Sequence, residues 1–212
     1  MRDALVVANA PWRWREEFVT LLRRSALVLA ADGGANHLAR VGVRPAAVVG
    51  DLDSIRPGVR RWVGEERIVA RPDQESTDLH KTLAYAFDER GVRRVTVVAA
   101  TGGRLDHAIE NLALLGRWAG RGEVELLDEE HRIVAVSGTF SATAAAGATV
   151  SLMPLGRCER VWTQGLRWAL DGEPLDLAGR TSVSNVADGG PVEVRVEGGV
   201  VLVFLPGLSR GC

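Results

Sequence analysis

The first 125 or so residues alternate short apolar runs with segments of helical period, and this alternation restricts the possible folds more than any other feature. The apolar runs are Leu5–Ala8, Ala26–Ala31, Ala46–Gly50, Arg67–Ala70, Val95–Ala100 and Val124–Leu127. Helical spacing of apolar residues appears between them, in Trp12–Arg24, Thr77–Arg90 and Leu105–Ala119. Continuous apolar strands separated by helices are typical of a parallel sheet buried on both faces. We therefore predict a doubly wound α/β domain over residues 1–128.

From about residue 130 the helical period disappears and short strand-like runs replace it. These runs are Arg132–Val136, Ala148–Met153, Val161–Thr163, Val192–Val196 and Val200–Leu205. Turn-forming clusters, such as Asp-Gly-Gly-Pro at 188–191, separate them. The pattern predicts a small antiparallel β-sandwich over residues 129–212.

The overall composition excludes several classes of protein. A net charge of −1 argues against a broad surface for nucleic acid or anionic lipid. No run of 18 apolar residues is present, and the apolar stretch Ala4–Ala8 is too short for a signal peptide, so we expect no membrane segment. Cys158 and Cys212 have no zinc-ligand spacing and provide no disulfide framework, which favours a cytoplasmic location.

Acidic residues collect where the predicted strands end. The clusters are Asp32-Gly33-Gly34-Ala35-Asn36, Asp51-Leu52-Asp53, Asp73-Gln74 with Thr77-Asp78, and Gly102-Gly103-Arg104-Leu105-Asp106-His107. The carboxyl ends of parallel strands share one edge of an open sheet, and ligands bind in the crevice there. We therefore expect the four clusters to converge on one pocket.

Several carboxylates in one pocket indicate a divalent cation. Like charges repel unless a cation neutralises them, and Mg²⁺ prefers oxygen ligands. Asp51 and Asp53 are two positions apart, so they would share a face of an extended segment or converge in a turn, with Asp32 and Asp78 completing the ligand set. The alternative for any single aspartate is a helix cap or a turn.

Glycine pairs at two strand–helix junctions indicate a phosphate site. Gly33-Gly34 and Gly102-Gly103 would expose backbone N–H groups to an anion, although a tight connection explains them equally well. The sequence contains neither the P-loop motif nor the dinucleotide-binding GxGxxG motif.

Basic and polar residues on two helices complete the candidate site. Lys81 is the only lysine of the chain and lies three residues after Asp78, so it would reach a phosphate or form an ordinary surface ion pair. Arg104, His107 and Asn111 form a polar stripe in which Arg104 opposes the preference of a helix start for anions. A phosphate partner would explain Arg104, whereas His107 has an equally good structural interpretation.

These motifs, in this order, resemble the thiamine pyrophosphokinase family. Thr163-Gln-Gly-Leu-Arg-Trp168 and Ser182-Val-Ser-Asn185 in the second half are similar to the thiamine-binding β-domain of that family. The resemblance covers nearly the whole chain, with one departure: a common Asn-Gly after the first strand is Asn9-Ala10 here.

The resemblance implies a homodimeric enzyme that transfers the terminal diphosphate of ATP to the hydroxyl of thiamine, giving thiamine diphosphate and AMP. The implied Mg²⁺ ligands are Asp32, Asp51, Asp53 and Asp78. The implied catalytic residues are Asp51, Asp53, Asp73, Asp78 and Lys81. The implied ATP contacts are Asp32, Gly33, Gly34, Asn36, Gly102, Gly103, Arg104, Asp106, His107 and Asn111. The implied contacts with thiamine are Gln74, Trp168, Ser182, Ser184 and Asn185.

Phosphoryl-transfer chemistry agrees with this interpretation because it depends mainly on positioning and charge neutralisation. Asp73 or Asp78 would accept the proton of the alcohol. The indole of Trp168 would offer a face to the thiamine cation, or else pack in the core. Two other functions remain open: diphosphate transfer to another heterocyclic alcohol, such as a hydroxymethyl-pterin, and nucleotide binding without catalysis.

Overall fold

The structure, a computed structural model, describes residues 3–207, so Cys212 lies outside the described residues. The chain packs as two compact units, one up to Asn111 and one from Leu112 onward. This division falls inside a helix, and the domain boundary expected after residue 128 stays a prediction. Among the described residues, no helix combines the length and hydropathy needed to cross a membrane.

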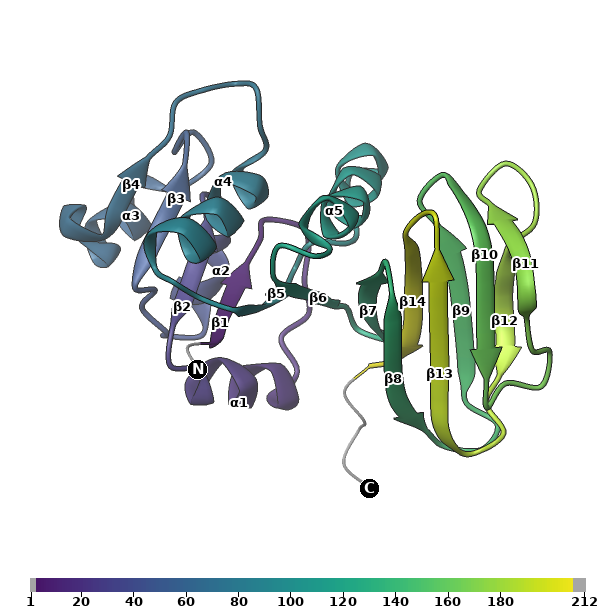
Figure 1. Cartoon of the computed structure of the whole chain (residues 1–212). Coiled ribbons are helices and arrows are strands. Elements are labelled where there is room, and N and C mark those ends of the chain that lie inside the picture. The colour runs from purple at the N-terminus through teal and green to yellow at the C-terminus, as the bar shows by residue number, and fades with distance from the viewer. Residues whose placement is uncertain (1–2, 208–212) are drawn as a thin grey trace. The chain divides into compact units, whose positions relative to one another are not determined.

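The first unit contains a five-stranded parallel sheet (Figure 1). Its strands are β1 (Asp3–Val7), β2 (Val28–Ala31), β3 (Ala47–Gly50), β4 (Ile68–Ala70) and β5 (Arg94–Val98). Their order is β5-β1-β2-β3-β4, and each neighbouring pair is parallel. Every residue of β2 and β3 is buried, as expected for strands covered on both faces. The predicted α/β class is confirmed.

The helices of this unit match the predicted segments in part. They are α1 (Glu16–Arg24), α2 (Gly34–Arg40), α3 (Pro57–Val63), the 3₁₀ turn η1 (Glu65–Arg67), α4 (Asp78–Ala84), the π-helical η2 (Tyr85–Glu89) and α5 (Leu105–Trp118). A helix was expected after Gly33-Gly34, where α2 lies, but without bounds, and α3 was not predicted, because seven residues hold too few turns for a clear apolar period. Helix α1 begins four residues after Trp12, whose ring packs edge-on against Phe18 with centroids 4.8 Å apart.

The strand order places the loops that carry the candidate residues at one edge of the sheet. Strands β2, β3 and β4 follow β1 to one side, and β5 pairs with the other side of β1. The connections therefore reverse direction between β1 and β5, and such switch points open a crevice at the carboxyl ends of the strands. The loops after β2, β3, β4 and β5 carry the acidic clusters.

The second unit is antiparallel. Its strands are β6 (Glu123–Leu127), β7 (His131–Val136), β8 (Thr139–Ala144), β9 (Thr149–Pro154), β10 (Arg157–Gln164), β11 (Asp171–Asp176), β12 (Ser182–Val186), β13 (Gly190–Glu197) and β14 (Val201–Pro206). One layer has the order β12-β9-β14-β7-β6 and the other β11-β10-β13-β8. Between them lies an apolar core that includes Val150, Leu152, Leu175 and Val192. The predicted antiparallel fold of this half is confirmed.

Strand β6 begins the antiparallel part of the chain. It pairs antiparallel with β7, with Glu125 opposite Val134, and the expectation that the run at 124–127 also belongs to the parallel set stays a prediction. The short hairpin 128–130 allows only this direction, because a parallel connection needs a crossover of a dozen or more residues. Strands β8, β11 and β12 were not predicted, because small and polar residues interrupt their apolar pattern.

Candidate active site

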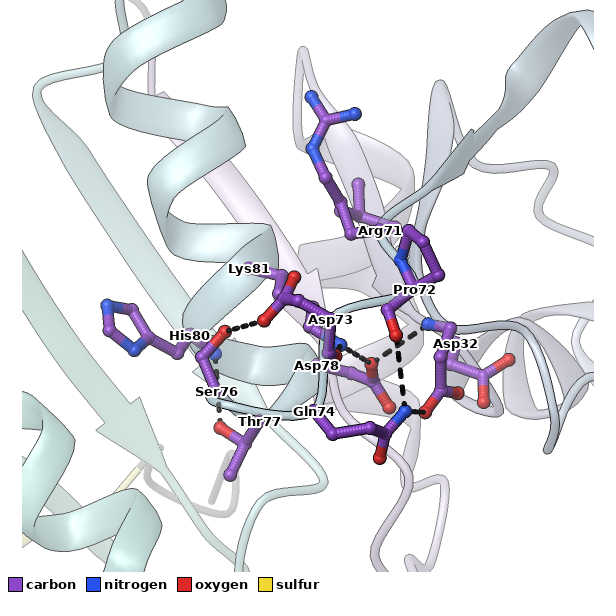
Figure 2. Close-up of polar contacts among 12 residues, drawn as sticks. Asp32, Arg71, Pro72, Asp73, Gln74, Ser76, Thr77, Asp78, His80 and Lys81 are labelled. Carbon is purple, nitrogen blue, oxygen red and sulfur yellow. Dashed lines mark hydrogen bonds and ion pairs between the residues drawn. The ribbon is translucent and has the colours of Figure 1, made fainter.

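Three carboxylates from separate loops meet at the carboxyl edge of the parallel sheet. Asp32 follows β2, Asp51 follows β3, and Asp78 is the first residue of α4. One oxygen of each lies within 4.8 Å of the others. Figure 2 shows Asp32, Gln74 and Asp78 close together beside the start of α4. We call Asp32, Asp51 and Asp78 the acidic triad.

Asp32 anchors the loop that follows β3. Its two carboxylate oxygens accept hydrogen bonds from the backbone N–H groups of Ser54 at 2.8 Å and Ile55 at 3.0 Å. Asp32 has a φ of 39°, a left-handed conformation that aspartate tolerates better than most residues. Burial raises the pKa of Asp32 above its usual value, although the N–H of Ser54 partly opposes this. A neighbouring cation would favour the ionised form.

Asp51 and Asp53 lie in a turn, one of the two arrangements expected, and their side chains remain neighbours. Leu52 has a φ of 70°, and the N–H of Asp53 donates to Oδ1 of Asp51 at 3.3 Å. Asp53, one of four predicted metal ligands, lies outside the acidic triad and accepts a hydrogen bond from the Ser54 hydroxyl at 2.8 Å. The Gln74 amide donates to Asp51 Oδ2 at 3.1 Å and lowers the pKa of Asp51.

Asp78 is positioned by the start of α4. Thr77 caps this helix by accepting the N–H of His80, which places Asp78 in the first turn (Figure 2). Oδ1 of Asp78 accepts the N–H of Asp51 at 3.2 Å and lies 3.5 Å from Nζ of Lys81. Burial raises the pKa of Asp78, and the negative charge of Asp51 adds to this rise.

Lys81 is buried behind the acidic triad, so the alternative of a solvated surface pair does not describe it. Its side chain is 4% exposed, and Nζ donates to the backbone carbonyl of Asp73 at 2.6 Å. The Asp73 carboxylate accepts instead from the Ser76 hydroxyl at 3.1 Å (Figure 2). Lys81 therefore supplies a fixed positive charge beside Asp78, and Asp73 contributes its main chain to this arrangement.

Gly50 is required by the close approach of the triad, and the sequence analysis did not include it among the site residues. A Cβ atom at Gly50 would lie 2.7 Å from Oδ1 of Asp78 and 2.9 Å from Cβ of Asp32. Both contacts are closer than real Cβ atoms approach, so any other residue would push the carboxylates apart. The glycine directly before Asp51 was the available signal.

The two glycine pairs serve close packing of the loops. A Cβ on Gly34 would overlap the carbonyl oxygen of Val7, and one on Gly33 would overlap the side chain of Asn9. Gly102 and Gly103 have φ of 92° and 65°, and a Cβ on Gly103 would lie 2.8 Å from Pro11. The tight-connection interpretation therefore explains both pairs without an anion. The side chain of Asn36 also fixes a loop, by donating to the Ser54 carbonyl and accepting from the N–H of Arg56.

The polar residues of α5 have partners of their own. Arg104 pairs with Asp106 at 2.6 Å on the exposed first turn, and this hydrogen bond lowers the pKa of Asp106 to about 2. The side chain of His107 is exposed, and its backbone N–H donates to Oδ1 of Asp106 at 3.0 Å. Asn111 is buried and donates to the carbonyl of Ala100 at 2.8 Å, joining the helix to the end of β5. Asp106 thus supplies the anionic partner that Arg104 was expected to need.

The acidic triad has the chemistry that a Mg²⁺ site requires. It offers hard oxygen donors from three separate segments. Burial and repulsion raise the pKa values of Asp32 and Asp78, and a neighbouring cation would lower both. The carboxylate oxygens of Asp32 and Asp51 accept hydrogen bonds from backbone N–H groups, and these bonds fix the orientation of the remaining lone pairs. The residues present therefore fit the cation.

A pocket of about 210 Å³ lies in the second unit. It is lined by Trp168, Leu170, Arg180, Thr181, Ser182, Val183 and Asn185. Three predicted thiamine contacts, Trp168, Ser182 and Asn185, therefore lie together, and Trp168 is 58% exposed rather than packed in the core. Ser184 is not among the lining residues, and its N–H donates to the Ser151 hydroxyl. Arg180 was missed because no motif marks it.

Two family models match consecutive parts of this chain. The model described as "Thiamin pyrophosphokinase, catalytic domain" matches residues 18–125, and "Thiamin pyrophosphokinase, vitamin B1 binding domain" matches residues 131–201. The chain belongs to the thiamin pyrophosphokinase family. The first match contains the acidic triad and the second contains the pocket, so both candidate regions lie within the thiamin pyrophosphokinase domains.

Individual relatives agree with the thiamin pyrophosphokinase assignment. Thiamine pyrophosphokinase 1 of Oryza sativa subsp. japonica is 30% identical over 78% of this chain and 73% of its own length. Thiamine pyrophosphokinase 1 of Arabidopsis thaliana is 30% identical over 87% of this chain and 79% of its own length. The fold is similar to that of the thiamin pyrophosphokinase from Candida albicans, with a TM-score of 0.82, 18% identity, and coverage of 97% of this chain and 88% of that chain.

Proposed function

We propose that this chain transfers the diphosphate of ATP to the hydroxyl of thiamine, giving thiamine diphosphate and AMP. The observation that carries the proposal is the acidic triad with a buried lysine behind it, inside a matched thiamin pyrophosphokinase catalytic domain. The relatives described above carry the same activity in their names. No comparison supports transfer to a pterin or nucleotide binding without catalysis.

In this proposal Asp32, Asp51 and Asp78 hold Mg²⁺, which would neutralise charge on the phosphate oxygens of ATP. Asp53, at the exposed end of the same loop, is kept as an outer member of the site. Lys81 directs its ammonium group toward the phosphates from behind Asp78. The segments that carry Gly33, Gly34 and Asn36 and residues 102–107 are proposed to border this site and to contact the nucleotide.

The chain's residues would act mainly by orientation and charge. The alcohol oxygen of thiamine attacks the β-phosphorus, the bond to the α-phosphate oxygen breaks, and AMP leaves. A carboxylate accepts the alcohol proton. Asp73 and Asp78 are the candidates for that role, and the raised pKa of Asp78 does not decide between them, because Mg²⁺ bound to Asp78 would lower it. Gln74 orients Asp51 through the hydrogen bond described above.

The acceptor is proposed to bind in the pocket of the second unit. Trp168 offers an exposed indole face to the planar cation, and the Ser182 hydroxyl borders the same cavity. Ser184 is retained as a predicted contact on the neighbouring surface of β12.

The nucleotide product tests this proposal directly. Incubation with ATP, Mg²⁺ and thiamine is expected to give AMP and thiamine diphosphate in equal amounts, because the bond between the α- and β-phosphates is the one that breaks. Chromatography of the nucleotides, with a hydroxymethyl-pterin in place of thiamine as control, gives the measurement. ADP as the product, or faster turnover with the pterin, would contradict the proposal.

A homodimer is proposed from an exposed apolar pair on α5. Leu105 and Ile109 are 73% and 60% exposed, and residues four apart lie on the same face of a helix. Exposed apolar side chains at neighbouring positions are typical of interfaces between copies of a chain.

Replacing both residues by glutamate is therefore expected to convert the dimer to a monomer, because four buried charges would face one another across a two-fold interface. Light scattering coupled to size-exclusion chromatography measures the mass. Leu177→Glu, at another exposed leucine, is the matched control and should leave the mass unchanged. An unchanged dimer in the double variant would place the interface elsewhere.

We also propose a cytoplasmic location. The support is Cys158, a buried free thiol in a chain without a disulfide framework.

A further inference from the structure

Asn185 was predicted as a thiamine contact, but its side chain is fully engaged within the protein. Oδ1 accepts the N–H of Trp168 at 3.2 Å and the N–H of Val186 at 2.8 Å. Nδ2 donates to the carbonyl of Trp168 at 2.7 Å and to the Ser182 hydroxyl at 3.3 Å. A carboxamide has two N–H donors and two acceptor lone pairs, so no polar capacity is left for a ligand.

Two of these hydrogen bonds hold the main chain of Trp168 on both sides of its Cα atom. The carboxamide therefore binds the N–H and the carbonyl of a single residue, in the manner of a neighbouring β-strand. Asn185 is 2% exposed, whereas Trp168 is 58% exposed and lines the pocket. The buried Asn185 side chain, with all its hydrogen-bonding groups used, therefore holds the main chain of a residue whose aromatic ring is exposed.

The residues around Trp168 add to this support. The N–H of Arg167 donates to the carbonyl of Val186 at 2.8 Å, and Leu166 forms an isolated bridge with Ala187. The Arg167 guanidinium lies 5.6 Å from the centroid of the Trp168 ring. These contacts fix the segment 166–168 against the end of β12, but only Asn185 bonds the main chain of Trp168 through a side chain among the hydrogen bonds described.

We propose that Asn185 is a positioning residue that orients the Trp168 indole for the acceptor, and not a residue that touches the acceptor. This inference rests on the proposed function for the identity of the acceptor. It predicts that the effect of Asn185 on acceptor binding is exerted through Trp168 and disappears when the indole is absent.

A double-mutant cycle tests the dependence on Trp168. Trp168→Ala is expected to raise the KM for thiamine about 10-fold, the order expected for loss of a cation–π contact. Asn185→Ser is expected to raise this KM roughly 5-fold and to change kcat less than about 2-fold, because the indole is displaced while the phosphate site is intact. In the Trp168→Ala background, Asn185→Ser should add less than about 2-fold.

Two outcomes of the cycle would overturn the inference. Additive effects on KM would show that Asn185 contacts the acceptor itself. An unchanged KM with a lowered melting temperature would show a purely structural role. Val192→Ala, which creates a cavity in the core of the same unit, is the control for the effect of lowered stability and should leave the KM for thiamine unchanged. If Asn185→Ser does not fold, Asn185→Asp keeps both acceptor contacts and takes its place in the cycle.

A second measurement does not depend on the substrate. In ¹⁵N-labelled protein, the indole N–H signal that Trp168→Ala removes identifies Trp168. Asn185→Ser should shift or broaden this signal, and Val192→Ala should not. An unmoved signal would overturn the positioning role. If the signal moves but the wild-type chain forms no AMP with thiamine, the proposed function fails and the positioning of Trp168 by Asn185 stands.

Discussion

Asp78→Asn is expected to lower kcat for AMP formation by at least about 100-fold, the order seen when a preorganised charge is removed from a transition state. Asp78 lies at the centre of the site: it belongs to the acidic triad, accepts the N–H of Asp51 and lies beside Lys81. Asparagine keeps the shape and one acceptor oxygen but removes the charge that would bind Mg²⁺ and accept a proton.

Thermal stability separates loss of the cation from loss of folding. Mg²⁺ should raise the melting temperature of the wild-type chain, because a ligand that binds only the native state stabilises it. Asp78→Asn should show little of this rise. Without Mg²⁺ the variant should melt no lower than the wild type, since one of several mutually repelling charges has been removed.

Glu66→Gln, at an exposed carboxylate on η1, is the control and should retain both activity and the Mg²⁺ effect. A fully active Asp78→Asn variant would exclude Asp78 as metal ligand and as base. If the variant is inactive but Mg²⁺ raises its melting temperature as much as that of the wild type, Asp78 acts in catalysis and is not a metal ligand.

Lys81→Met is expected to lower kcat about 100-fold, with an intact response to Mg²⁺. The Lys81 ammonium group is the positive charge nearest the acidic triad among the contacts described, and its loss removes stabilisation of the transferred phosphates. Methionine also leaves the Asp73 carbonyl without its donor, so the free energy of unfolding should fall by about 1–3 kcal/mol. The acidic triad itself is unchanged, and Mg²⁺ should still raise the melting temperature.

Lys81→Arg tests whether charge alone is sufficient. We expect little recovery of kcat, because a planar guanidinium does not fit where a compact ammonium group is 4% exposed. Arg60→Gln is the control. Arg60 lies on α3 and forms an exposed ion pair with Glu65 of η1, so this variant should retain full activity. Kinetics at a temperature well below each melting point gives the comparison. Equal activity of Lys81→Met and the wild type would show that Lys81 is structural.

Prediction from the sequence succeeded where the signal was local and periodic. Fully apolar runs predicted all five parallel strands, and helical spacing predicted α1, α4 and α5, although α1 begins later than expected. It failed for α3 and gave α2 only as a helix expected after Gly33-Gly34, because both helices are too short for a clear period. The pattern also gave no sign of the antiparallel pairing of β6 with β7, which the hairpin at 128–130 decides.

The candidate site shows the same limit. The position of the aspartates after successive strands predicted that they would gather, and the triad does so. The positive φ of Leu52 makes this loop a turn that places Asp53 beside Asp51 but outside the triad, and the residue types at 51–53 do not reveal that angle. Arg104 was assigned a phosphate because a helix start disfavours a cation, and the structure shows that Asp106 supplies an anionic partner within the chain.

By itself, the sequence determined the class of fold and the set of chemical groups available, because strand burial and residue type are properties of the local pattern. Only the tertiary structure decided which groups act together: that Lys81 is buried behind Asp78, that Gly50 leaves room for the triad, and that Asn185 is saturated by Trp168. These are distances between loops far apart in the chain. Such distances depend on how the loops pack, and packing is a property of the whole fold.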